Sequence, residues 1–318
     1  MSDGPFLIHG MTLAFAWFLL LNAAVSLLVV LASSRLTKRP GPGSPGLWLA
    51  LRLSPAAVSI TFVALVFLPS YWRYEPREFV EGFDVTLTAL AGLAVVIAGA
   101  AVARGVTAWR RAEQRTQDWM RAGRPLALAD TSMKAYAIDT DAPLMALVGM
   151  LRPRLLITRP VLEALTDEEL SASVAHELGH WHAWDNLKRL AMRAAPDLLS
   201  ASGAARALER RWAAAAEHVA DLSAGDSGDA RCALASALVK VARLTPRSPS
   251  VGEPISALID GGDITARVQR LLDDAPAGGR GPVRWLAFLV PAAVLAIGYS
   301  PLLRVVHSVT EVLVNGLP

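Results

Sequence analysis

The chain has 318 residues, 53% of them hydrophobic, and a mean hydropathy of +0.38. These values are high for a soluble globular protein and indicate membrane segments. The net charge of +3 comes from arginine clusters beside apolar stretches, which argues against direct nucleic-acid binding, and the single cysteine excludes an intramolecular disulfide.

Four apolar stretches are long enough to cross a bilayer, which requires about 20 residues. We expect transmembrane helices at about 11–33, 47–69, 85–103 and 285–303. Arg52 lies near one end of the second stretch, where its long side chain can extend to the interface. The first stretch is too long, and its preceding residues too poor in Lys and Arg, for a cleaved signal peptide. Alternatively, one or two of the stretches are buried core helices.

The basic residues predict how the chain is oriented in a cell membrane. Arginines and lysines follow the first stretch and the third stretch, whereas the loop between the second and third is mainly acidic. The positive-inside rule therefore places both termini outside the cytoplasm and residues 104–284 inside. We expect a membrane region at 1–103, a cytoplasmic domain at 104–284, and a last helix with a short external tail at 285–318.

Within residues 104–284, patterns of apolar and turn residues predict strands followed by helices. AYAIDT, LMALVGM and RLLITR, between 135 and 159, are typical of strands. Residues 166–169 form a capping box that begins a helix reaching about His182. Further helices are expected at about 187–199, broken or ended near Pro196, at 204–224 and at 229–244. Residues 245–256 are expected to be a loop and 274–283 a linker, and Cys232 a small buried side chain.

The sharpest motif is His176-Glu177-Leu178-Gly179-His180, inside the capped helix. Histidines at positions i and i+4 share one helical face, so both imidazoles can bind one tetrahedral Zn²⁺. Glu177 is next to the first ligand and can act on a water at the metal. The pattern predicts a zinc-dependent hydrolase with Glu177 as the catalytic base.

A catalytic zinc needs a third protein ligand and one open position. Glu217 is the best candidate, and Asp221, four residues later, can accept a hydrogen bond from a ligand histidine. Alternatively, these carboxylates form an ordinary polar stripe of their helix. His182 and His218 point away from the ligand face and are more typical of surface or supporting residues.

These residues resemble known metallopeptidases. Gluzincins pair HExxH with a downstream ExxxD, as in Glu217 and Asp221. A closer resemblance, to the BlaR/MecR membrane metallopeptidases, rests on residues 148–180, on Asp185-Asn186-Leu187, and on EHVAD (217–221) with ALASALVKVARL beyond it. The positions of the four apolar stretches around the predicted domain agree with that family.

The resemblance implies a mainly α membrane protein with four transmembrane helices and an inserted α+β zincin-like protease domain that holds one Zn²⁺. It also implies signalling by cleavage of a cytoplasmic winged-helix repressor of the BlaI/MecI type, and it places Arg267, Asp185 and Asn186 near the site. Well-known members carry a penicillin-binding sensor domain after the last span, where this sequence has a short tail. We therefore do not expect direct β-lactam sensing.

Two other functions stay open. The first is quality-control proteolysis of membrane proteins, as in the similar HtpX-like peptidases. The second is a non-catalytic membrane receptor or scaffold with a structural zinc, which would need a fourth ligand from His182 or His218. For either protease, we expect the substrate to lie extended against an edge strand, LMALVGM or RLLITR.

Overall fold

The structure is a computed structural model. It describes residues 4–37, 41–77, 84–128, 133–150, 152–225, 227–244, 256–257, 264–273 and 286–316.

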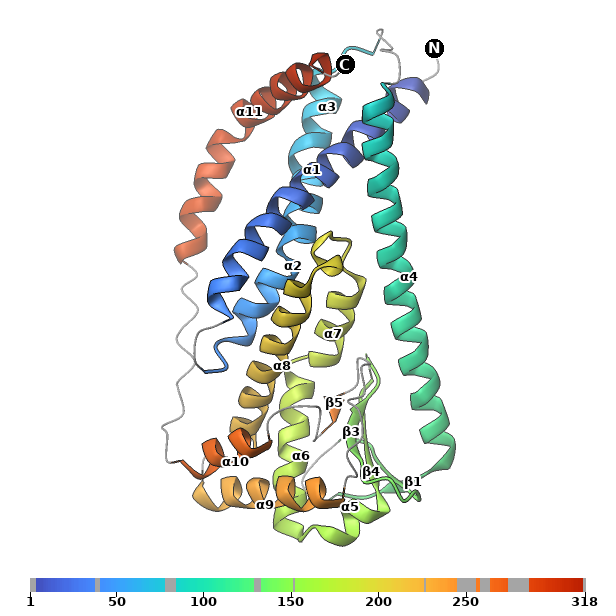
Figure 1. The fold of residues 1–318 in the computed structure, drawn as a ribbon, viewed down its shortest axis with the longest axis vertical. Helices are drawn as coiled ribbons and strands as arrows, with labels where there is room; N and C mark the ends of the chain where they lie inside the picture. Colours follow the sequence, from blue (N-terminus) through green and yellow to red (C-terminus); the bar gives the residue numbers. More distant parts are fainter. Residues whose placement is uncertain are drawn as a thin grey trace.

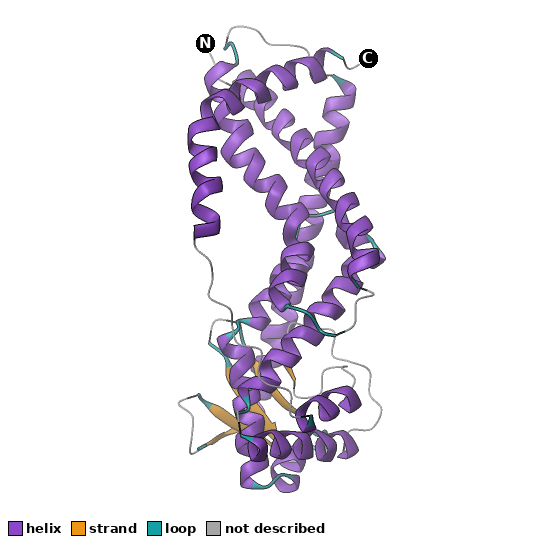
Figure 2. Ribbon diagram, turned by 90° about the vertical axis from the view of Figure 1, so that its left-hand side faces the viewer, coloured by secondary structure: helices purple, strands orange, loops and turns teal. Residues whose placement is uncertain are grey.

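Long helices form one half of the molecule (Figures 1 and 2). Helix α1 covers Gly4–Leu36. A second rod follows, made of α2 (Pro45–Phe62), the π-helical turn η1 (Val63–Phe67) and α3 (Leu68–Tyr74). Helix α4 covers Val85–Ala122. Among the described residues, these three units are long and apolar enough to cross a membrane, which supports a membrane protein.

Helix α4 continues well beyond the predicted end at residue 103. The residues after 103 are mostly arginine, alanine, glutamate and glutamine, which favour helix, so α4 carries the arginine-rich segment out of the apolar stretch without a break. The apolar run shows where a membrane could lie and not where a helix ends.

The expected fourth span lies within α11, Leu286–Asn315, which is also longer than predicted. Its later turns lie beside α3 (Figure 1), and the Tyr299 hydroxyl donates to the Leu65 carbonyl. That α11 crosses the membrane stays a prediction. The start of α1 and the end of α11 lie at the same end of the molecule, opposite the sheet (Figure 1).

A five-stranded sheet occupies the other half, in the order β1-β2-β4-β3-β5. The three predicted strands are confirmed as β2 (Ala135–Ile138), β3 (Met145–Val148) and β4 (Arg154–Thr158). Two further strands, β1 (Gly123–Leu126) and β5 (Ser256–Ala257), were not predicted. Among the strands that the structure describes, only β2 and β4 pair in parallel.

The sheet order corrects one expectation about the substrate. Strand β4, the RLLITR segment, lies between β2 and β3 and therefore cannot offer a free edge. Strand β3 pairs with β4 on one side, and on the other side β5 covers Ala146 and Leu147. Ser256 therefore belongs to a strand and not to the expected loop; the rest of that loop, 245–255, and the linker 274–283 lie outside the described residues.

The remaining helical segments include the four predicted ones, observed at 167–182, 185–194, 203–223 and 228–244, and three that were not predicted, at 159–164, 199–201 and 264–272. They are α5 (Arg159–Ala164), α6 (Asp167–His182), α7 (Asp185–Ala194), η2 (Leu199–Ala201), α8 (Gly203–Ser223), α9 (Gly228–Leu244) and α10 (Ile264–Leu272). Helix α7 ends before Pro196, because the residue preceding a proline disfavours helical geometry. Side chains of β3 and β4 form an apolar core with α6, α9 and α10.

Two side chains differ from expectation. Arg52 does not extend to the interface: it is 2% exposed and lies in a network of polar groups supplied by residues 192–209. Those partners come from a distant segment, so the local sequence could not reveal them. Cys232 is exposed on α9 and not buried.

The capping box at the start of α6 is present and also reaches α9. Thr166 accepts from the Glu169 backbone N–H at 3.3 Å, and Glu169 accepts from the Thr166 N–H at 2.8 Å. Glu169 also accepts from Ser236 at 2.6 Å and from Lys240 at 2.7 Å. One buried carboxylate therefore begins the motif helix and fixes it to its neighbour.

We predict that Glu169→Ala lowers the free energy of unfolding by about 1–3 kcal/mol, because it leaves buried donors without their charged acceptor. Chemical denaturation measures this. Burial raises the pKa of Glu169, but the bonds from Lys240, Ser236 and Thr166 outweigh it and bring the pKa below its ordinary value. The stabilisation is therefore present at neutral pH and disappears as the pH falls through the folded-state pKa.

The control is Glu163→Ala, which removes an exposed ion pair with Arg159. Exposed pairs contribute about 0–1 kcal/mol. Equal losses in the two variants would contradict the assigned role of Glu169.

Candidate metal centre

The two motif histidines lie one turn apart on α6 and face the same way. His176 and His180 are 0% and 1% exposed, and their ring centroids are 4.9 Å apart with the rings nearly perpendicular. Two imidazoles in this arrangement can contribute two ligands to one metal ion.

Helix α8 crosses α6 and brings Glu217 to both rings. One Glu217 oxygen lies 3.6 Å from His176 Nε2 and the other lies 3.5 Å from His180 Nε2. The three potential ligand atoms lie within 4.8 Å of one another. The structure therefore brings together the three residues proposed as ligands, although 37 positions separate His180 from Glu217 in the sequence.

The second nitrogen of each ring faces a carboxylate. His180 Nδ1 lies 2.8 Å from Asp185 Oδ2, and His176 Nδ1 lies 3.2 Å from Asp221 Oδ1. Asp185 can accept the ring N–H of His180, which fixes the tautomer and leaves Nε2 available to a metal. His176 Nδ1 lies close to Asp221 without meeting hydrogen-bond geometry. The sequence placed Asp221 in this role, whereas it gave Asp185 only as a residue near the site.

The turn between α6 and α7 brings Asp185 back to the motif. Trp184 has a left-handed backbone with φ of 57°, which is uncommon outside glycine and is often found at functional sites. Asn186 then donates to the carbonyls of Leu147 and Gly149, at 3.1 and 3.3 Å. The two residues after the turn thus connect the motif helix to β3.

Arg267, on α10, completes the cluster. Its guanidinium donates to Asp221 and lies 3.0 Å from a Glu217 oxygen and 3.5 Å from His176 Nε2. Only the family resemblance had placed this arginine near the site. Its sequence signal is weak: Arg267 shares an apolar helix face with Ile264 and Leu271.

The unsatisfied polar atoms show that the site fits a cation. Both oxygens of Glu177, both of Glu217 and Nε2 of His180 are buried without a hydrogen bond, although one Glu217 oxygen is ion-paired with Arg267. Buried acceptors of this kind cost several kcal/mol unless something compensates them. A catalytic zinc site has three protein ligands and one position left for water. The two imidazoles and one carboxylate here supply the three ligands, so the residues present fit Zn²⁺.

Glu177 is fully buried beside the ligands. Burial raises its pKa to about 8, and the Glu217 charge acts in the same direction, against the opposing effects of His180 and Arg267. A metal cation would favour the ionised carboxylate that a general base needs. Burial also lowers the pKa of His176, which keeps its imidazole in the neutral form that binds metals.

The other histidines proposed as possible fourth ligands lie outside this group. His182 is exposed and stacks on Trp181, and His218 is only partly buried. A second group of possible ligands, Glu75, His307 and Glu311, lies in the other half of the molecule and is only partly buried.

The close contact between α6 and α8 depends on Gly179. A Cβ there would lie 2.7 Å from Ser223 Oγ and 3.2 Å from the Ala220 Cα. We predict that Gly179→Val separates the two helices and lowers zinc affinity at least about tenfold, with a loss of about 1–3 kcal/mol in the free energy of unfolding.

Zinc titration and denaturation measure these effects. Gly228→Val is the matched control, because a Cβ at Gly228 meets nothing within 4 Å. Wild-type zinc affinity in the Gly179 variant would show that the close helix contact does not set the ligand geometry.

The model of Peptidase family M48 matches residues 110–245, which include α6, α7 and α8 with the proposed ligands. This match supports a membrane-type metallopeptidase, and peptidases of that family are typically zinc-dependent. A search of the curated proteins finds no match.

Proposed function

We propose that this membrane-associated metalloprotease is a zinc-dependent endopeptidase that hydrolyses peptide bonds of a cytoplasmic protein segment. The observation that carries the proposal is the buried group formed by His176, His180 and Glu217, with Glu177 beside it. A structural zinc site would have four protein ligands and no need of Glu177. The described residues supply three ligands, which argues against the receptor or scaffold alternative.

The roles of the residues follow from their positions. His176, His180 and Glu217 would hold Zn²⁺, which supplies a Lewis acid that polarises a carbonyl and lowers the pKa of water. Glu177 accepts the proton of the attacking water on a carboxylate oxygen and delivers it to the leaving amine nitrogen. Asp221 and Asp185 keep the imidazoles oriented while this happens.

The cytoplasmic placement of the site is part of the proposal. The arginines along the later turns of α4 and those beside the predicted fourth span support it through the positive-inside rule. The start of α1 and the end of α11 lie opposite the sheet (Figure 1), as expected for external termini and an internal catalytic domain.

Two classes of substrate are supported, each by a different observation. The resemblance to BlaR/MecR proteins supports cleavage of a winged-helix repressor. The position of Glu217 favours a segment close to the membrane: Arg211 donates to the carbonyls of Thr37 and Gly41, in the loop between the first two spans. Glu217 is six residues further along α8, which is about 9 Å. That position supports quality-control cleavage of membrane proteins as the alternative.

We predict that Glu177→Gln lowers kcat at least about 100-fold, because the amide cannot accept the proton, while about one zinc per chain stays bound. Metal analysis and peptide cleavage of the full-length protein in detergent test this. Loss of zinc from the variant would contradict the assignment of Glu177 as the base.

We predict that Glu217→Ala lowers zinc affinity at least about 100-fold, more than loss of a supporting residue usually does. Titration against a chelator measures the affinity, and Arg210→Ala, at an exposed position of the same helix, is the control. Full zinc occupancy at low free zinc would remove Glu217 from the ligand set.

The substrate is tested by offering the wild-type protein a winged-helix repressor, a membrane protein with a cytoplasmic juxtamembrane segment, and an unrelated unfolded protein. Selective cleavage of the repressor supports signalling. Cleavage of the membrane protein and the unfolded protein supports quality control, and cleavage of none in the zinc-loaded protein contradicts both.

A further inference from the structure

The loop between α7 and α8 lies deep among the membrane helices, although it belongs to the segment that carries the metal centre. Asn22, halfway along the first predicted span, donates to the Pro196 carbonyl at 3.0 Å and accepts from the Leu198 N–H at 2.9 Å. Leu198 packs against an apolar cluster that includes Phe18 and Ala94. Ala94 is itself halfway along the third predicted span.

The depth of this loop follows from helix geometry. Asn22 is eleven residues from Ser33, the predicted end of the first span, which corresponds to about 16 Å at 1.5 Å per residue. A bilayer core is about 30 Å thick. The loop therefore lies near the level of the bilayer centre, between α2 and α4 (Figure 1).

Irregular backbone at that depth is tolerated only where protein groups satisfy it. Asn22 satisfies two backbone groups of the loop, and it is 1% exposed. Arg104, at the end of the third span, donates to the Ala195 carbonyl at 3.1 Å. Polar residues inside membrane segments are costly and usually functional, and here their partners belong to one loop.

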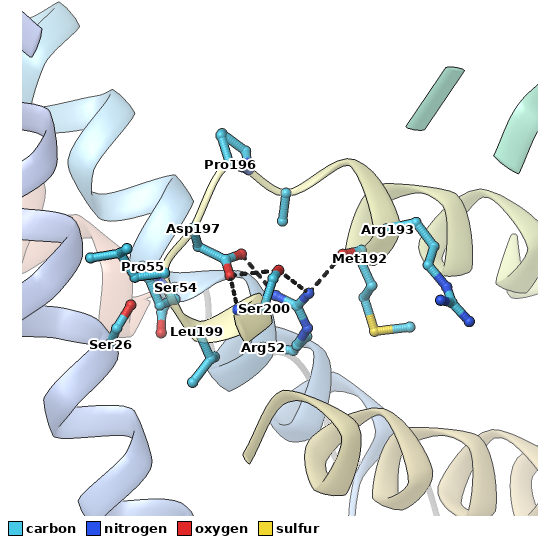
Figure 3. Close-up of polar contacts among 12 residues, drawn as sticks. Ser26, Arg52, Ser54, Pro55, Met192, Arg193, Pro196, Asp197, Leu199 and Ser200 are labelled. Carbon is cyan, nitrogen blue, oxygen red and sulfur yellow. Dashed lines mark hydrogen bonds and ion pairs between the residues drawn. The ribbon is translucent and has the colours of Figure 1, made fainter. Parts of the chain in front are cut away.

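Arg52 makes the largest set of these contacts (Figure 3). Its guanidinium donates to the Met192 carbonyl at 2.8 Å, to Asp197 at 2.8 Å and to Ser200 at 2.9 Å. It also donates to Glu209 at 2.9 Å. One buried side chain of α2 thus joins the end of α7, the 3-10 turn η2 and the early part of α8.

Both helices lead from this loop to the metal centre. Helix α7 begins at Asp185, which faces His180. Asp185 is seven residues, or about 10 Å, from Met192 along this helix. Glu217 is eight residues or about 12 Å along α8 from Glu209. A displacement of the loop would therefore move a ligand and a supporting carboxylate together.

We propose that Asn22 and Arg52 are positioning residues that clamp the α7–α8 loop inside the membrane bundle, so that the arrangement of the transmembrane helices sets the geometry of the metal centre. This inference rests on the proposed zinc-protease function. It predicts that a stimulus that shifts α1 or α2 changes catalysis through the loop, without any contact with the substrate.

The main variant is the double substitution Arg52→Met with Asp197→Asn. Removing Arg52 alone would leave the buried Asp197 charge unpaired, which is strongly destabilising, whereas neutral replacements of both members of a buried pair are often tolerated. The amide introduced at position 197 can still accept from the Ser200 backbone N–H, so the turn keeps its cap.

The full-length variant is compared with wild type in lipid nanodiscs for melting temperature, zinc affinity against a chelator, the absorption spectrum of bound Co²⁺, and kcat and KM separately. We expect a melting temperature within a few degrees of wild type, zinc affinity and kcat each at least about tenfold lower, an altered Co²⁺ spectrum and KM within about twofold. Asn22→Leu should lower zinc affinity and kcat in the same way, with a larger fall in melting temperature, because the Pro196 carbonyl and the Leu198 N–H lose their partner. Arg110→Met, at an exposed position of α4, is the control and should change none of these.

Wild-type zinc affinity, Co²⁺ spectrum and kcat in the folded double variant would overturn the inference. Failure of both variants to fold would also overturn it, because the contacts would then serve stability and not positioning. If the wild-type protein neither binds zinc nor cleaves peptides, the proposed function is wrong. That failure can be told apart from failure of the positioning inference, because it is seen in the wild-type protein without any variant.

Discussion

The site depends on the contact of α6 with α8, which buries two imidazoles and two carboxylates together. Glu177 and Glu217 have four oxygens without a hydrogen bond. Burying such groups is unfavourable unless a cation compensates them. Much of the surrounding structure serves this contact: Gly179 allows the close approach, Asp185 and Asp221 orient the rings, and Arg267 offsets part of the negative charge.

Helix α8 connects this centre to the membrane helices. Its early turns pack beside α2 through Leu208 and Trp212, in an apolar cluster that includes Trp48. Its later turns carry Glu217 and Asp221. One continuous helix therefore joins the membrane helices to the proposed metal centre. We infer that a change in the packing of one part affects the stability of the other. This arrangement suits an enzyme whose activity responds to events in the membrane, as the proposed signalling role requires.

Local patterns in the sequence predicted the elements that depend on nearby residues. The capping box predicted the start of α6, and periodicity predicted three strands and the helices from α7 to α9. The spacing of the motif residues predicted that Glu217 and Asp221 lie close to the histidines. Features that depend on distant partners could not be predicted. Arg52 and Asn22 have their partners near residue 197, the order of the sheet is set by tertiary pairing, and β5 contains only two residues. Arg267 was placed by family resemblance and not by spacing.

Zinc K-edge X-ray absorption of the full-length protein tests the central claim most directly. We expect about one zinc per chain, coordinated by two imidazole nitrogens at about 2.0–2.1 Å and by oxygen atoms from one carboxylate and one water. A closed set of four protein ligands, or a purified active protein without zinc, would contradict the account.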